Sequence, residues 1–227
     1  MLAEALLSIV IGLTIPKLFV VLFLKKQQRV MMYYMFWGFF SAILVYYIYD
    51  FLNGFSLNLL YQEVTITPLL EEFVKAFPLI ALFLVTGRKF EKYILPFAMA
   101  SGIGFSILGN YIFTMSGGDF AQINVVLYAI MRAGGTSLMQ GCCTAIIGYG
   151  LYLIKDMDKK ALPALLLGLY AVSVIIHAIY NLLVFYSDTG KYFGILISFI
   201  LLISLLSLYY QDKLPKLEDL SGLMLAE

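Results

Sequence analysis

The chain has 227 residues, of which 62% are hydrophobic and 13% are charged, and its mean hydropathy is +0.93. A soluble domain is about half apolar and about a quarter charged, so this composition excludes an ordinary water-soluble protein. The net charge of +1 offers no basic field to nucleic acid, and no nucleic-acid partner is expected. Cys142 and Cys143 are neighbours in an apolar run, where helix geometry separates their side chains, and we interpret them as packing residues.

Seven stretches have the length of about 20 mostly apolar residues that a helix needs to cross a bilayer. They are approximately Leu2–Leu24, Tyr33–Leu52, Pro68–Thr86, Tyr93–Met115, Val125–Ile154, Ala161–Tyr186 and Tyr192–Tyr210. We interpret the first as a retained span, because its basic residues follow the apolar run instead of preceding it. The sequence thus predicts an all-α, polytopic transmembrane bundle, with one domain over residues 1–210 and a short cytoplasmic tail over 211–227.

The basic residues of the connecting segments predict the orientation of the bundle. Eleven of the fifteen Lys and Arg residues fall in segments on one side, one (Lys191) falls on the other, and three lie within spans. Because cytoplasmic segments are enriched in Lys and Arg, the N-terminus is predicted outside and the C-terminus in the cytoplasm. The longest outer connection, Asn53 to Thr67, contains three apolar residues in a row and is expected to lie along the interface.

The third span opens with two adjacent carboxylates, Glu71 and Glu72, followed by Lys75. Lys75 lies four residues after one glutamate and three after the other, so it can pair with either on a helix. Ionisable residues inside a bilayer are costly and often mark function. The structural alternative is that the glutamates cap the start of the helix, with Lys75 as their counter-ion.

The fourth, fifth and sixth spans also carry polar residues at helical spacing. Asn110 shares a face with Ser106 in the fourth span, where small-residue packing is an equal alternative to function. In the fifth span Arg132, Thr136, Gln140 and Thr144 recur every four residues, and this stripe must face the bundle or a water-filled cavity. His177 and Asn181 point the same way in the sixth span. With the predicted orientation, these groups converge on one pocket in the outer half of the bilayer. An inter-helix pair of Arg132 with Glu71 or Glu72 is a structural alternative compatible with function.

These segments, in this order, resemble the PrsW family of intramembrane proteases, which is related to the type II CAAX prenyl protease and abortive-infection group. The resemblance covers the third to sixth spans, about residues 68–186. Its motifs align with Glu71-Glu72-Phe-Val-Lys75, with Gly102-Ile-Gly104-Phe105 through Gly109-Asn110, with Arg132 through Gln140 and Thr144, and with His177-Ala-Ile-Tyr-Asn181. Two positions depart from the pattern: Gly109 stands where the family has glutamate, and Gln140 where it has histidine.

The resemblance implies hydrolysis of a membrane-embedded, for example single-span, protein substrate by a glutamate-activated water. Either Glu71 or Glu72 is then the general base, with Lys75 or Arg132 adjusting its proton affinity and Asn110 and Gln140 in supporting positions. His177 holds water or a metal such as zinc, and Asn181 donates to the oxyanion. Because Gln140 is a weak metal ligand, the sequence leaves open a divergent active enzyme and an inactive member, natural or engineered, that only binds its substrate.

A non-enzymatic seven-helix sensor or small-molecule transporter is the alternative function. The last span has no lysine for a retinal Schiff base, and no inverted repeat is evident, but neither observation excludes a sensor. The small size and short loops favour the cytoplasmic membrane of a prokaryote, with lipids as the surroundings.

Overall fold

A computed structural model describes residues 2–21, 28–54, 58–85, 94–115 and 125–211. These residues form helices and short turns, and no strand occurs among them. The elements are α1 (Leu2–Val21), α2 (Gln28–Asn53), α3 (Leu59–Tyr61), η1 (Gln62–Ile66), α4 (Thr67–Val85), α5 (Ile94–Met115), α6 (Val125–Met131), η2 (Arg132–Thr136), α7 (Ser137–Ile154), α8 (Leu162–Tyr186) and α9 (Asp188–Gln211). The predicted all-α bundle is confirmed. The predicted tail falls almost wholly outside the described residues.

Each of the seven predicted spans corresponds to a helix or a continuous helical run. Five of them, in α2, α5, α6 to α7, α8 and α9, are long and apolar enough to cross a membrane. In α1 a shorter apolar stretch, Leu6–Val20, is found. The helix α4 has 19 residues and carries three of the ionisable residues of the predicted pocket, which lower its mean hydropathy. The charged residues of α4 that belong to the candidate site are therefore also the reason that its composition is less typical of a membrane span.

Helices α5 and α7 form the centre of the bundle, because most of their side chains are buried while few of those of α8 are. Without a hydrophobic driving force between helices in lipid, close packing at small residues holds such a bundle together. Gly102 of α5 meets the backbone of α7 at Gln140, and Gly104 of α5 meets the backbone of α2 at Met35. A Cβ atom at either glycine would lie 2.2 Å or less from a carbonyl oxygen of the partner helix. Glycine is thus required at both positions for the helices to approach.

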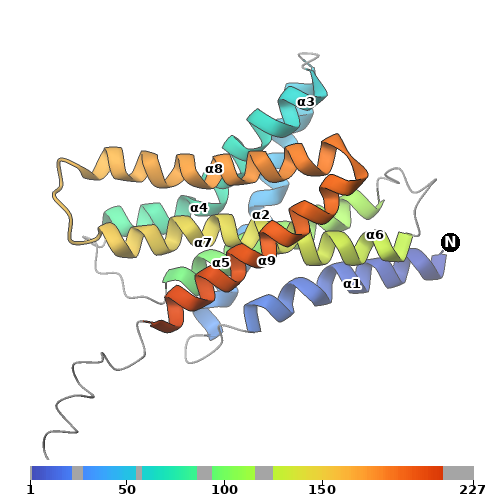
Figure 1. Cartoon of the computed structure of the whole chain (residues 1–227), viewed down its shortest axis with the longest axis horizontal. Helices are drawn as coiled ribbons and strands as arrows, with labels where there is room; N and C mark the ends of the chain where they lie inside the picture. Colours follow the sequence, from blue (N-terminus) through green and yellow to red (C-terminus); the bar gives the residue numbers. More distant parts are fainter. Residues whose placement is uncertain (1, 22–27, 55–57, 86–93, 116–124, 212–227) are drawn as a thin grey trace, which may run out of the picture.

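Helices α7 and α8 run antiparallel and are joined by a short turn, and α9 crosses the bundle diagonally (Figure 1). The same view places this turn and the N-terminal end of α1 at opposite ends of the bundle. Helix α4 contacts both α7 and α8, so three helices surround the predicted pocket.

Two π-helical turns interrupt the regular helices just before the pocket. The turn η1 joins α3 to α4, and η2 joins α6 to α7. The predicted interfacial connection is therefore helical from residue 59 onward, with Leu59, Leu60 and Tyr61 exposed. A π-helical turn inserts one residue into the helical register and is often found at functional sites. Both turns immediately precede helices that carry pocket residues.

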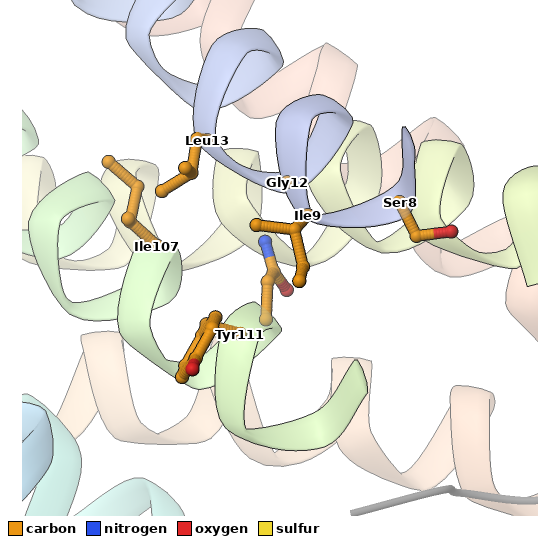
Figure 2. A pocket seen from close by; sticks show the side chains of 7 residues that line it. Ser8, Ile9, Gly12, Leu13, Ile107 and Tyr111 are labelled. Atoms are coloured by element: carbon orange, nitrogen blue, oxygen red, sulfur yellow. The ribbon is translucent and has the colours of Figure 1, made fainter. Parts of the chain in front are cut away.

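A shallow hollow lies between α1 and α5. Figure 2 shows the side chains that line it, namely Ser8, Ile9, Gly12, Leu13, Ile107 and Tyr111. Asn110 also lines it, and its side-chain amide donates to Ser137 Oγ of α7 at 2.9 Å. Asn110 thus links α5 to α7 through a side-chain hydrogen bond, which is a role in helix packing.

Candidate active site

The two adjacent glutamates of α4 are buried inside the bundle and have different partners. Glu72 is fully buried, and its Oε1 lies 2.6 Å from Lys75 Nζ and 2.8 Å from His177 Nδ1. Its Oε2 accepts a hydrogen bond from Ser173 at 3.1 Å. The carboxylate of Glu72 therefore joins one turn of α4 to α8, and the ion pairs expected for Lys75 are formed with this glutamate.

Glu71 faces side chains of α7, α8 and α2. Its Oε2 accepts a hydrogen bond from Gln140 Nε2 at 2.7 Å and lies 3.8 Å from His177 Nε2. Its Oε1 accepts from the Tyr49 hydroxyl of α2 at 3.3 Å. The side chain of Glu71 is 10% exposed while that of Glu72 is 0% exposed, so Glu71 is the more accessible of the two carboxylates.

Gln140 lies at the centre of this network and connects α7 to both other helices. Its Oε1 accepts a hydrogen bond from Lys75, and its Nε2 faces Glu71 and, at 3.5 Å, His177 Nε2. Lys75 is fully buried and is also held over the ring of Phe105 at 5.3 Å. Such complete pairing is what buried charges require, because an unpaired charge in a low dielectric is costly.

The remaining predicted residues lie outside this inner network. Asn181 donates through Nδ2 to the backbone carbonyl of Glu63 in η1 at 2.8 Å. Arg132, the first residue of η2, is half-buried, and its positive charge acts on Glu63. Burial and the neighbouring Glu71 raise the pKa of Glu63, which precedes α4. The sequence allowed a pair of Arg132 with Glu72, but the ion pairs of Glu72 in the structure are with Lys75 and His177.

The polar stripe of the fifth span is divided between two environments. Gln140 and Thr144 are buried, and Thr144 Oγ1 donates to the Gln140 carbonyl at 3.1 Å. Thr136, at the end of η2, shares a hydrogen bond of 2.9 Å with the Tyr180 hydroxyl of α8. The stripe therefore faces the bundle as predicted, but only Gln140 reaches the glutamates among the hydrogen bonds described.

Ser173 and Tyr49 were not among the predicted site residues. Ser173 lies one helical turn before His177, so the spacing 173, 177 and 181 placed it on the same face of α8 and could have revealed it. Tyr49 lies in an aromatic segment of α2 that has no distinguishing sequence signal. Only the packing of α2 against α4 brings its hydroxyl to Glu71.

Replacing Ser173 by alanine is expected to lower the free energy of unfolding by about 1–3 kcal/mol, because the buried Glu72 carboxylate loses a hydrogen bond. The single hydrogen of this hydroxyl is shared with the Cys143 carbonyl, 2.9 Å away, so the substitution also removes a contact between α8 and α7. The measurement is denaturant unfolding in detergent micelles. Ser204→Ala is the matched control: that hydroxyl is exposed and bonds only within its own helix at 2.9 Å, so its loss should cost less than about 0.5 kcal/mol. Equal effects of the two substitutions would contradict the assignment.

This geometry, a pair of buried carboxylates with a histidine between membrane helices, can be compared with known proteins. The model of the PrsW family intramembrane metalloprotease matches residues 26–207. The chain belongs to this family. It is accordingly a multi-pass membrane protein with an intramembrane protease-like domain. No curated protein and no solved structure matches it.

The description of the PrsW family implies a metal ion, so the donor set of this member must be tested against one. A catalytic zinc site has three protein ligands drawn from His, Glu, Asp and Cys. Among the residues that the structure describes, no three such side chains are grouped to hold a metal. Glu71 and His177 offer two ligand atoms, but Gln140 turns its Nε2 toward both. The ammonium group of Lys75 already neutralises Glu72. This donor set does not fit a zinc ion.

Proposed function

We propose that this chain is a glutamate-dependent intramembrane protease that cleaves membrane-embedded protein segments in the pocket between α4, α7 and α8. The observation that supports this most is the buried network of Glu71, Glu72 and His177, which comes from two different helices and lies within the family's domain. Apolar side chains of similar volume often stabilise a fold as well as a buried ion pair does. Stability alone therefore does not explain why charged groups occupy these positions. Two carboxylates of different accessibility suit the two tasks of proton transfer and positioning.

In this proposal Glu71 is the general base, because its carboxylate is the more accessible one. The water oxygen attacks the carbonyl carbon of the substrate, and the water proton passes to Glu71 while the carbonyl electron pair forms an oxyanion. When the C–N bond breaks, the same proton passes from Glu71 to the departing amine. His177 Nε2, 3.8 Å from Glu71 Oε2, accepts a hydrogen bond from the second O–H of the water, and this hydrogen stays on the oxygen that becomes part of the new carboxyl group. The substrate gains one water, and the enzyme returns to its starting state.

Glu72 and Gln140 have the supporting roles. Glu72 accepts from His177 Nδ1, which leaves the lone pair of Nε2 directed toward Glu71. Gln140 Nε2 carries two hydrogens, and the one facing His177 at 3.5 Å makes the weaker bond. We assign this N–H to the oxyanion. The sequence indicated Asn181 for that role, but its amide donates to the Glu63 carbonyl and is better placed to hold η1 against α8.

The environment of the reaction follows from the same proposal. We infer that the protein lies in the cytoplasmic membrane of a prokaryote, with its N-terminus outside, its C-terminus inside and the pocket in the outer half of the bilayer. The distribution of basic residues between the connecting segments supports this orientation. Substrates are then single-span or other membrane-embedded protein segments that reach the pocket from the lipid.

The test is cleavage of single-span substrates by the purified chain reconstituted into liposomes. Glu71→Gln is expected to lower the cleavage rate at least about 100-fold, since a positioned general base contributes about 10²–10⁴-fold. Asp50→Asn is the matched control, because it also removes one carboxylate charge but at an exposed position of α2. Cleavage that persists in Glu71→Gln would contradict the proposal. A small molecule that raises the thermal stability of a chain that cleaves no substrate would favour the sensor instead.

A further inference from the structure

The side-chain amide of Gln140 lies between the two atoms of the pocket that are best suited to bind a metal. Glu71 Oε2 and His177 Nε2 are 3.8 Å apart, and Gln140 Nε2 lies 2.7 Å from the first and 3.5 Å from the second. Two ligands of a tetrahedral zinc, each about 2.0–2.1 Å from the ion, are about 3.4 Å apart. The pair in this chain is thus spaced within a few tenths of an ångström of a zinc ligand pair, with an N–H donor between its members.

Lys75 determines which end of the amide points toward this pair. Its ammonium group donates to Gln140 Oε1, so Nε2 must turn toward Glu71. A flipped amide would bring NH₂ against the ammonium group and the carbonyl oxygen against the carboxylate, replacing two attractive contacts by two repulsive ones. All three side chains are buried, where such contacts are strong. The hydrogen-bond network therefore selects a single orientation of the amide.

Glu72 determines the protonation of His177 in the same way. A carboxylate can only accept, so the 2.8 Å contact requires the proton on His177 Nδ1. In the neutral ring Nε2 is then an acceptor, as it would be for a metal. A carboxylate behind a histidine in this manner is also the usual second-layer arrangement of metal-binding histidines. Glu71 Oε2 and His177 Nε2 are thus both acceptors that face the same point. Gln140 Nε2 is the donor that lies there.

We propose that the Gln140 amide, oriented by Lys75, occupies the place of a metal ion and keeps the pocket of this chain metal-free. One N–H of its NH₂ group faces Glu71 and the other faces His177, and the latter provides the electrophile of the site without a cation. This inference rests on the proposed function only for the identity of the pocket, and metal content measures it independently of cleavage. It follows that one substitution at position 140, which provides a third ligand, should convert the hydrogen-bonded pocket into a metal site.

The experiment compares the full-length chain with Gln140→His and with the double variant Gln140→His, His177→Ala, all purified in detergent. Each is titrated with Co²⁺, whose visible absorption reports tetrahedral coordination, and with Zn²⁺ followed by elemental analysis after desalting. The unsubstituted chain should retain less than about 0.1 equivalent of either ion. Gln140→His should retain about one equivalent and show the tetrahedral bands, and the double variant should lose both.

One equivalent of Co²⁺ bound by the unsubstituted chain and lost in His177→Ala would overturn the proposal, because the pocket would then already be a metal site. A folded Gln140→His chain that binds no ion would overturn it as well. If histidine does not fit at this position, Gln140→Glu provides a third ligand on a side chain of the same length and is judged by the same criteria. Gln140→Met, which has similar volume but neither donor nor ligand oxygen, is the control for packing and should bind no ion. A failure of cleavage with these metal results unchanged would refute the proposed function alone.

Discussion

Replacing Glu72 by glutamine is expected to lower the free energy of unfolding by about 3–5 kcal/mol, the usual cost of breaking a buried ion pair by removing one partner. The substitution keeps the shape of the side chain but leaves the ammonium group of Lys75, which is fully buried, without its 2.6 Å carboxylate. The glutamine keeps one carbonyl oxygen that can accept from His177 Nδ1, but this oxygen carries no charge, and the NH₂ group that replaces Oε2 can no longer accept from Ser173. Denaturant unfolding in micelles measures the effect, and cleavage by the same variant should be lost as well.

A double-mutant cycle with Lys75→Met separates the ion pair from a general loss of packing. Lys75→Met alone leaves Glu72 without its cation and is also expected to destabilise strongly. The double variant should lose about 1–3 kcal/mol less than the sum of the two single variants, because it leaves neither charge unpaired. Effects that add within about 0.5 kcal/mol would show that the two groups do not act as a pair.

Replacing Gly102 by alanine is expected to destabilise the bundle by about 3 kcal/mol, at the upper end of the usual cost of overpacking. The added Cβ would lie 2.2 Å from the Gln140 carbonyl oxygen, and its next neighbours are also backbone atoms of α7. Backbone cannot rotate away as a side chain can, so α5 and α7 must separate. That separation also displaces Gln140, and the loss of stability should be accompanied by a loss of cleavage.

Gly109→Ala is the matched control on the same helix. A Cβ at Gly109 would meet nothing within 4 Å, so the substitution creates no clash. Alanine has the higher helix propensity, so the free energy of unfolding should stay unchanged or rise by up to about 1 kcal/mol. Equal destabilisation by both substitutions would contradict the close approach of α5 and α7 at Gly102. The open space at Gly109 also means that packing does not exclude the glutamate that the sequence resemblance led us to expect at this position.

Composition and periodicity alone determined most of the fold of this protein. In a bilayer every backbone polar group must be satisfied within its own segment, so long apolar runs can only become helices. The spans of α2, α5, α8 and α9 were therefore predictable to within a few residues. The two π-helical turns were not, because the extra residue in η1 and η2 depends on what the turn packs against.

The membership of the candidate site was only partly determined by the sequence. The spacing of Glu71, Glu72 and Lys75, and that of His177 within α8, placed these residues on shared faces, since helical periodicity is a local property. The partners of each group depend on distances between helices. Tertiary structure alone decided that Glu72 takes both Lys75 and His177, that Asn110 fastens α5 to α7, and that Asn181 holds η1.

Gln140 shows most clearly which properties of the site the sequence predicts and which only the tertiary structure decides. From the sequence it was a departure from the pattern, a residue that binds metal poorly where histidine was expected. The structure gives it four neighbours with defined directions, because Lys75 holds its oxygen while Glu71 and His177 face its nitrogen and Thr144 its carbonyl. A sequence lists donors and acceptors, but only the packing of α4, α7 and α8 decides which of them meet, and hence whether a site holds a metal ion or an N–H group.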